Sequence, residues 1–466
     1  MLSRPPARWP VLSLVLAATL LAAGCGTVDI DQALRDTDAR TAAFTRGDLS
    51  LARTPEQRAA RAALADSLLS APLSEDDAVR LALVNSPALQ ALLAERWAEL
   101  AAADQAGRPV NPLFKFERLR LGDELEIGRL LSVGLVDLLL LPQRLSLSKS
   151  LSEQARLQLA ASVVDQVTQV RQAWVRAVAA GQSLAYAKQV AEAADAGAEL
   201  ARRMQQAGNF SRLQQARQQV FEADAGIQRT QAEQAAVASR EALVRVLGLD
   251  DAQAARLVLP PRLPELPRKL RDALALAADA GSQRIDLQLA RARLDAAAKS
   301  QGLDLVPSFV DAELGGRHDS VFAGDTRATR SGWELDIRLP LFDLGTSRRD
   351  ALDAQALAAL NRYQATARGA ASQLREDYAG YRSAWALAQR HRDEILPLRQ
   401  RIAEENLLRY NGMLIGVFEL LAETREQIAG VRAAIDAEQQ FWLADAALAA
   451  SLIGRPPTST TTFETP

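Results

Sequence analysis

The feature of this 466-residue chain that most constrains its fold is a long segment that occurs twice, about two hundred residues apart. Gly208 and Gly412 each follow a long, proline-poor stretch rich in alanine, glutamine and arginine, and each is followed by a second such stretch. Three shorter matches recur at similar offsets: Gly226-Ile227 with Gly430-Val431, Val246-Leu247-Gly248 with Leu452-Ile453-Gly454, and Pro112-Leu113-Phe114 with Pro307-Ser308-Phe309. A unit of this length is too long for one module of a small solenoid. We therefore predict that the chain is built from two internal repeats.

The stretches before the two glycines have the spacing of very long helices. Residues 143–207 contain no proline, and residues 348–411 contain only Pro397. At 1.5 Å per residue, each helix would extend roughly 90 to 100 Å. Shorter helices, over about residues 209–247 and 413–453, are predicted to return from the glycine turns.

The apolar residues of the first long stretch are mostly small and cover a broad sector from position 160 to position 180. A coiled coil has a narrow seam of two apolar residues in seven. The broad sector favours a helix with neighbours on both sides, as in a closed ring of helices. A two-stranded coiled-coil stalk remains the alternative.

A period of two residues, typical of strands, precedes each long helix. Residues 113–120 and 125–137 are candidate strands in the first copy, and residues 309–314 and 333–339 in the second. A polar loop over residues 315–332, which contains His318, Asp319 and Asp325, is expected between the second pair. Tilted strands of about ten residues are long enough to cross a bilayer.

The last of these strands has one apolar and one charged side. Its apolar positions alternate with charged ones, Trp333, Leu335, Ile337 and Leu339 against Glu334, Asp336 and Arg338. We expect the apolar set to face lipid, because hydrocarbon does not accommodate charge without a large cost. Trp333 would lie at the outer interface beside the polar loop, and Phe342 at the opposite interface. A half-buried hairpin packed on helices is the alternative.

The first 25 residues read as a targeting segment. Arg4 and Arg8 precede an apolar run over residues 11–21, and Leu21-Ala22-Ala23-Gly24-Cys25 is similar to a bacterial lipobox. Cys25 is the only cysteine of the chain, so it has no intramolecular disulfide partner. We predict cleavage before Cys25, lipidation of its thiol and an outer-membrane destination. The alternative is an ordinary secretory signal with an incidental cysteine.

Composition argues against other classes of function. The formal net charge of −2 provides no large basic face, so no nucleic-acid partner is expected. Two histidines, His318 and His391, and one cysteine cannot assemble a zinc or thiol site. The sequence contains no Gly-rich phosphate loop and no Gly-x-Ser-x-Gly motif. We expect no catalytic residues, no metal and no cofactor.

Four motifs together resemble the TolC-type outer-membrane efflux protein family, in the order of that family, over about residues 75–454. They are residues 78–87 (AVRLALVNSP), 284–290 (RIDLQLA), 339–345 (LPLFDLG) and 409–412 (RYNG). The first copy departs from the family's pattern, because its tip at residues 203–208 has no tyrosine.

The resemblance implies a mainly α chain with a small membrane β-barrel. Each protomer of a homotrimer would give four strands to one shared barrel, and long helices to one α-barrel that reaches across the periplasm. The function implied is a passive exit duct of a tripartite efflux or type I secretion system, anchored in the outer membrane through Cys25. A periplasmic adaptor, an inner-membrane pump and outer-membrane lipid are the implied partners. The alternative is a structural coiled-coil lipoprotein that spans the periplasm without a pore.

The same resemblance suggests two sites near the glycine turns. Adaptor docking is expected at Gly208, Arg409, Tyr410 and Gly412. Glu419 and Glu423, four residues apart on one helix face, with Phe418 before them, are candidates for a periplasmic gate. Three copies would place six carboxylates around a narrow mouth. The alternatives for the two carboxylates are a solvated face or ion pairs with Arg409 and Arg425.

These interpretations divide the chain into six parts: a lipoprotein signal peptide (1–24), a lipidated extension (25–74), a first repeat (75–248), a linker (249–267), a second repeat (268–454) and a disordered tail (455–466).

Overall fold

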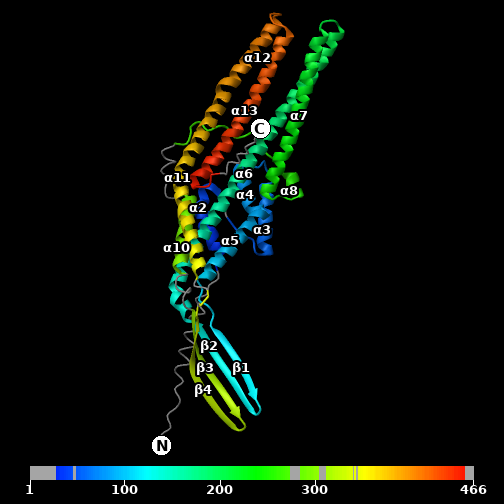
Figure 1. Cartoon of the computed structure of the whole chain (residues 1–466). Helices are drawn as coiled ribbons and strands as arrows, with labels where there is room; N and C mark the ends of the chain where they lie inside the picture. The colour runs from blue at the N-terminus through cyan, green and yellow to red at the C-terminus, as the bar shows by residue number, and fades with distance from the viewer. Residues whose placement is uncertain are drawn as a thin grey trace.

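The computed structural model describes residues 28–45, 49–272, 284–303, 311–339, 341–342 and 345–456. The molecule is elongated, with a sheet at one end, the turns of two helical hairpins at the other, and shorter helices around the middle (Figure 1). A mainly helical chain with a small antiparallel sheet confirms the predicted fold class at this level. The predicted signal peptide, Cys25 and nearly all of the predicted tail lie outside the described residues.

The sheet is a four-stranded antiparallel meander in the order β1-β2-β3-β4. Its strands are β1 (Leu113–Leu121), β2 (Glu124–Gly134), β3 (Asp311–Ala323) and β4 (Thr326–Arg338). The predicted loop over residues 315–332 is therefore wrong, since these residues complete β3 and β4 and only Gly324 and Asp325 form the turn. Most of these residues are polar on both faces, which hides the alternation, but backbone hydrogen bonds continue the ladder without it.

The first helical hairpin consists of α6 (Leu135–Gln206), 72 residues long, and α7 (Arg212–Leu247). At 1.5 Å per residue, α6 spans about 108 Å. The prediction of strand up to residue 137 is wrong, because β2 ends at Gly134 and α6 begins directly after it. Within the described ranges, no helix is both long enough and apolar enough to span a membrane.

The second helical hairpin is interrupted where the first is continuous. It ascends through α11 (Thr346–Arg390), a π-helical segment η1 (His391–Ile395) and α12 (Leu396–Asn411), and returns through α13 (Val417–Ile453). Pro397 has no N–H to donate to the carbonyl four residues earlier, which lies inside η1. The π-helical turn is the local rearrangement at the place where the α-helical ladder cannot continue.

Shorter helices surround the middle of α6. They are α2 (Ile30–Thr45), α3 (Pro55–Leu68), α4 (Glu75–Asn85), α5 (Pro87–Ala106), α8 (Asp251–Arg256) and α10 (Ile285–Leu303). Ser74 followed by three acidic residues is the sequence pattern of a helix start, and the structure agrees, because the Ser74 hydroxyl accepts a hydrogen bond from Asp77 N at 3.1 Å. The sequence before Ser74 is polar and loosely patterned and predicts no helix there, yet α2 and α3 occupy much of this segment. Burial of Ile30, Leu34 and Phe44 stabilises α2 on the main core.

The main hydrophobic core lies where these helices pack on α6. Trp174 of α6 is 2% exposed, and its indole N–H donates to Leu73 O at 2.9 Å. A smaller cluster joins α11 to α13 through Tyr381 and Phe441, whose ring centroids lie 5.5 Å apart. The core thus fixes both helical hairpins to the middle of the molecule and leaves their tips and the sheet projecting.

Candidate functional site

The tip of the first helical hairpin is a glycine turn. Gly208 follows α6 with a φ of 80°, a left-handed conformation that glycine adopts most readily. Asn209 N donates to Met204 O at 2.8 Å, which satisfies one of the last carbonyls of α6. The Ser211 hydroxyl then caps α7 by accepting from Gln214 N at 3.2 Å, and Ser211 N donates to the Gln214 side-chain oxygen at 2.6 Å, which completes a capping box. The predicted turn residue and the geometry therefore agree at this tip.

The second tip has a different geometry. Gly412 has a φ of −80°, and the left-handed residue is Met413, with a φ of 55°. Backbone N–H groups of Met413 and Leu414 donate to Tyr410 O at 2.9 Å and to Arg409 O at 2.8 Å. The docking candidates Arg409, Tyr410 and Gly412 thus lie together at one tip, while Gly208 lies at the other.

The gate candidates lie at the start of α13. Glu419 is exposed in its first turn, and Glu423, one turn further, accepts from Arg399 of α12 at 3.4 Å. Arg399 also donates to Glu426 at 2.9 Å. The side chain of Phe418 lies outside the described part of the structure. The partner of Glu423 is therefore a residue that the sequence reasoning missed, because the hairpin brings it close from 24 positions away.

Arg425 is not the partner of the acidic pair. Its guanidinium lies 4.6 Å from the ring centroid of Phe221 and donates to Arg217 O at 3.3 Å, so it contacts α7 of the first helical hairpin. A cation above an aromatic face is attracted by the negative charge density of the ring. This contact links the two helical hairpins near their tips.

At the opposite end of the molecule, the sheet has two chemically different faces. Residues opposite one another in the ladder share a face, so the register defines cross-strand rows. We call one face the hydrophobic face, because the rows nearest the helices are apolar. These rows are Phe114, Leu131, Gly316 and Trp333, then Val133, Leu314 and Leu335, then Ala312 and Ile337.

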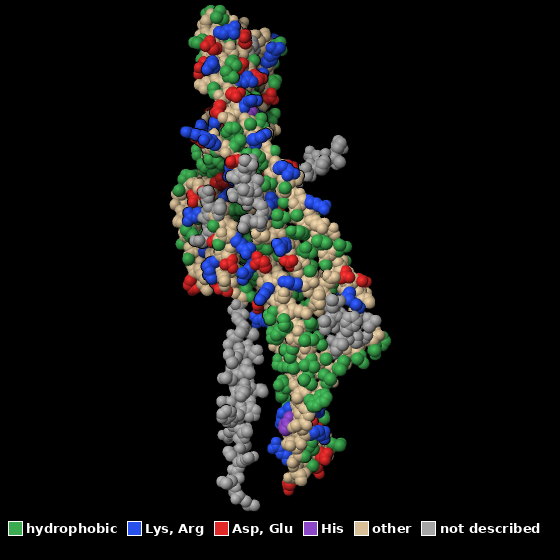
Figure 2. All heavy atoms as spheres, turned by 90° about the vertical axis from the view of Figure 1, so that its left-hand side faces the viewer, with side chains coloured by type: hydrophobic (Ala, Val, Ile, Leu, Met, Phe, Trp, Pro, Cys, Tyr) green, Lys and Arg blue, Asp and Glu red, His purple; other side chains and the backbone are tan. Residues whose placement is uncertain are grey.

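The predicted lipid-facing set of β4 lies on the hydrophobic face. Trp333, Leu335 and Ile337 are all exposed in the protomer, Trp333 at 76%, and Leu339 is exposed just beyond the strand. The sequence predicted that Trp333 lies beside a polar loop. In the structure it lies opposite Gly316, in the middle of the β3–β4 hairpin. Figure 2 shows hydrophobic side chains gathered where the sheet meets the helices, and charged ones nearer the turns.

The other face, which we call the acidic face, carries an ion-pair network. Arg317 contacts Asp319 at 2.9 Å, Glu334 at 3.4 Å and Glu117 at 3.5 Å. Asp319 is only 1% exposed, and Lys115 contacts Glu117 at 2.5 Å. Three strands therefore contribute charges to one surface, with carboxylates in excess. Such a surface suits an aqueous lumen and not hydrocarbon.

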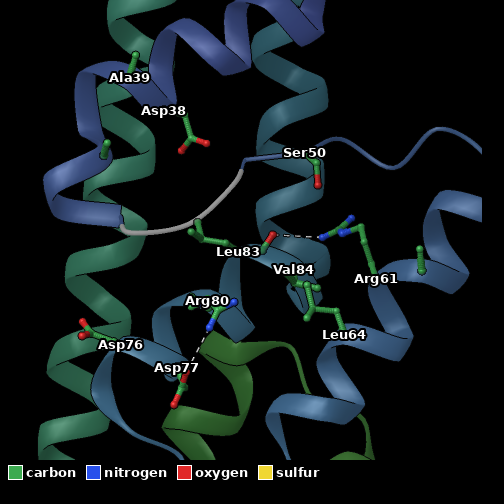
Figure 3. A pocket seen from close by; sticks show the side chains of 12 residues that line it. Asp38, Ala39, Ser50, Arg61, Leu64, Asp76, Asp77, Arg80, Leu83 and Val84 are labelled. Carbon is green, nitrogen blue, oxygen red and sulfur yellow. Dashed lines mark hydrogen bonds and ion pairs between the residues drawn. The ribbon is translucent and has the colours of Figure 1, made fainter.

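A cavity of about 810 Å³ lies between α2, α3 and α4, away from the sheet and the tips (Figure 3). Arg61 donates to Leu83 O at 3.3 Å from its wall, and burial lowers the pKa of Arg61. Arg80, which also lines the cavity, contacts Asp77 at 3.6 Å. The described residues that line the cavity include no histidine, cysteine or lysine. Across the described residues, no three His, Cys, Asp or Glu side chains gather to hold a metal ion.

Comparisons with known proteins point to one class of fold. No family model and no curated protein matches the sequence. Three solved structures match closely in shape: a membrane protein from Pseudomonas aeruginosa, the outer membrane protein VceC from Vibrio cholerae and the outer-membrane channel OprN. Their TM-scores are 0.67, 0.66 and 0.66, and their sequence identities are 20%, 15% and 18%. The matches cover 83%, 84% and 97% of this chain and 93%, 96% and 99% of those chains.

The chain therefore has the fold of outer-membrane channel proteins, which agrees with the mainly helical fold class with a small sheet that the resemblance to the TolC-type family implied.

Proposed function

We propose that this protein is the outer-membrane exit duct of a tripartite efflux or type I secretion system, and that it conducts substrates passively. The observation that carries the proposal is a sheet with one hydrophobic and one acidic face, joined directly to one helix, α6, that is about 100 Å long. A sheet of this kind suits a wall between lipid and water, and this helix has the reach of a periplasmic conduit. Similarity in fold to outer-membrane channels over most of the chain supports this reading.

The proposed assembly is a homotrimer of chains built from two internal repeats. The outer edges of β1 and β4 have no partner among the described strands, and exposed backbone edges in a membrane must be paired. Four strands are too few to close a barrel, whereas three copies would supply twelve. The long helices would close a second ring in the periplasm.

The membrane position follows from the hydrophobic face. Trp333, Leu335, Ile337 and Leu339 would contact hydrocarbon, and the acidic face would line the lumen. Lipidation of Cys25 would add an anchor in the same membrane. We also propose that the chain consists of a lipoprotein signal peptide (1–24), a lipidated extension (25–74), a first repeat (75–248), a linker (249–267), a second repeat (268–454) and a disordered tail (455–466).

The partners would meet the duct at its helical tips. A periplasmic adaptor, itself bound to an inner-membrane pump that supplies the energy, would dock near Gly208, Arg409, Tyr410 and Gly412. The gate would form at the start of α13 from Glu419, Glu423 and Phe418. Because Arg399 pairs with Glu423, the ring of unpaired negative charge would come mainly from Glu419.

Single-channel conductance in a planar bilayer tests the proposal. We expect discrete, voltage-stable openings from the purified protein. A structural lipoprotein that spans the periplasm without a pore, the alternative function, would give none.

Two variants of neighbouring residues sharpen the test. Ile337→Arg places a charge on the hydrophobic face and should impair membrane assembly by about 2–4 kcal/mol at mid-depth. Asp336→Asn, on the acidic face, should assemble normally and change only ion selectivity. Assembly of Ile337→Arg as efficient as that of the wild type would contradict the membrane position of β4.

A further inference from the structure

The hydrophobic face of the sheet changes character sharply beyond the row that contains Trp333. Toward the turns, the next row is Phe116, Arg129, His318 and Ser331, followed by Arg118, Ile127, Ser320 and Thr329, and then by Arg120, Leu125, Phe322 and Arg327. Each of these three rows contains at least one arginine, and all four strands contribute a basic side chain. We call Arg118, Arg120, Arg129, His318 and Arg327 the basic belt. Successive rows lie about 7 Å apart along the strands.

The basic belt contains no compensating carboxylate. Within β1–β4, every Asp and Glu whose side chain is described lies on the acidic face. None of the ion pairs found among the described residues joins an arginine of the belt to a carboxylate. By contrast, Arg317 and Arg330 on the acidic face both contact glutamates, at 3.4 Å and 3.9 Å. The arginines of the two faces therefore have different electrostatic surroundings.

The contacts of the belt leave its charge available. Arg120 donates to Gly122 O at 3.3 Å, Arg129 to Ser320 Oγ at 3.5 Å, and the Arg327 guanidinium lies 5.5 Å from the Phe322 ring centroid. These are neutral partners. Arg118 and Arg327 are both exposed. A guanidinium with neutral neighbours retains its full charge and several donors for an anion.

We propose that the basic belt binds phosphate groups on lipid headgroups of the outer leaflet. This inference rests on the proposed membrane position, in which the row containing Trp333 marks the outer boundary of the hydrocarbon. Trp and Tyr favour that boundary, and headgroups begin immediately beyond it. The belt begins at the adjacent row, so its guanidiniums would lie at the depth of headgroup phosphates.

The chemistry of the belt favours a phosphorylated lipid over a protein partner. Arginine pairs with phosphate in a bidentate geometry, and basic residues near an anionic membrane surface add attraction one by one. The belt is also continuous with the apolar rows, so a single lipid molecule could place its chains on Leu335 and Ile337 and its phosphate on the arginines. Its position on the edge strands β1 and β4 would extend it around an assembled barrel.

The test compares two double variants of the full-length protein in lipid vesicles. Arg118→Gln with Arg327→Gln removes two charges from the belt. Lys115→Gln with Arg330→Gln removes two charges from the acidic face of the same strands, β1 and β4, and is the matched control. The vesicles consist of a neutral, phosphate-free glycolipid mixed with either a phosphorylated glycolipid or the same phosphorylated glycolipid after removal of its phosphates. The measurement is the midpoint temperature of thermal unfolding, with insertion checked by protection of the sheet from added protease.

We expect the unfolding midpoint of the wild type and of the control to be higher with the phosphorylated glycolipid than with its phosphate-free form. The belt variant should lose about half or more of this difference in midpoint. High salt should reduce the shift. Equal midpoints in the two kinds of vesicle, or an equal loss in the control, would overturn the inference while leaving the duct intact. A shift reproduced by inorganic phosphate alone would assign the belt to a small anion instead of a lipid. Failure to insert into either vesicle would overturn the membrane position and the belt together.

Discussion

The two helical hairpins have the same topology, a long ascending segment and a returning helix, but they are stabilised in different ways. The first is built on α6, a single helix whose buried residues include Leu159, Val163, Val167 and Trp174 of the main core. The second climbs through α11, η1 and α12. Ala370, Tyr381 and Ala388 are buried in α11, and no residue of α12 is buried in the protomer.

The difference teaches that two helical hairpins can share a topology without sharing the way they pack. Apolar residues of α6 meet α2, α4 and α5, which hold it on several sides. Along its distal part, the second helical hairpin relies on its own return helix, through contacts such as Arg399 to Glu426. Exposed ion pairs contribute only about 0–1 kcal/mol each. The first helical hairpin is therefore the better anchored of the two.

A pair of tryptophans tests this difference most strongly. Trp174 and Trp385 both donate to a backbone carbonyl, of Leu73 at 2.9 Å and of Pro267 at 3.0 Å, but only Trp174 is fully buried. Trp174→Ala should lower the free energy of unfolding by about 3–5 kcal/mol. Trp385→Ala should lower it by roughly 1–2 kcal/mol, since less surface and the same single hydrogen bond are lost. Urea unfolding followed by circular dichroism measures both, and equal losses would remove the distinction between the helical hairpins.

Substitution of the glycines that follow the two return helices, α7 and α13, should have the next largest effect on stability. Gly248 and Gly454 have φ values of 68° and 89°. A Cβ on Gly248 would lie 2.5 Å from Pro87 Cδ and 2.8 Å from Ser86 Cα, whereas one on Gly454 would first meet the Asp286 carboxylate, which can move. Gly248→Ala should cost roughly 2–4 kcal/mol and Gly454→Ala roughly 1–2 kcal/mol.

Unfolding midpoints in urea again provide the measurement for the two glycines. Gly181→Ala is the control, because its Cβ would meet nothing within 4 Å and alanine favours a helix. A larger loss for Gly454→Ala than for Gly248→Ala would show that the start of α10 is the more rigid contact.

Substitutions at the two tips should change the free energy of unfolding in opposite directions. Gly208→Ala places a side chain on a residue with a φ of 80° and should cost about 1 kcal/mol. Met413→Gly relieves the left-handed strain at a φ of 55°, offset by greater freedom in the unfolded chain, and should stabilise by roughly 0.5 kcal/mol. Thermal unfolding of the two variants side by side measures the difference. Destabilisation in both would show that Met413 makes contacts that outweigh its backbone strain.

The smallest effects concern two glutamates, one on each helical hairpin. Burial raises the pKa of Glu438 in α13 above 4.5, against the opposing pull of Arg392 and Arg262. The folded state therefore favours its protonated form, so its contribution to stability is present below pH 4.5 and is lost as pH rises through the higher folded pKa. Glu438→Gln should remove this loss and leave the variant relatively more stable at neutral pH.

The pKa of Glu199 in α6 is shifted in the opposite direction. Its hydrogen bond with Arg203 lowers its pKa below 4.5, so its contribution is present above pH 4.5 and is lost as pH falls through the folded pKa. Unfolding midpoints of Glu438→Gln and Glu199→Gln, measured from acidic to neutral pH against the wild type, should diverge in opposite directions. If the midpoints of both variants followed the same dependence on pH, the burial assigned to Glu438 and the hydrogen bond assigned to Glu199 would both be contradicted.

By itself, the sequence determined the elements whose signals are local. The long helices, the helix start at Ser74 and the turn at Gly208 all follow from spacing, capping and backbone freedom within a few residues. The alternation around Ile337 likewise identified one strand and its apolar side. Each of these signals lies within the segment that it describes.

Tertiary structure alone decided the remaining features, because their causes lie far away in the chain. The distal halves of β3 and β4 are strands because backbone hydrogen bonds to neighbouring strands hold them, although their side chains show little alternation. Helix α2 is held by burial against α6. Arg399 reaches Glu423 only because α12 and α13 form a hairpin. The basic belt exists only in the register of four strands, which aligns arginines from both halves of the chain on one face.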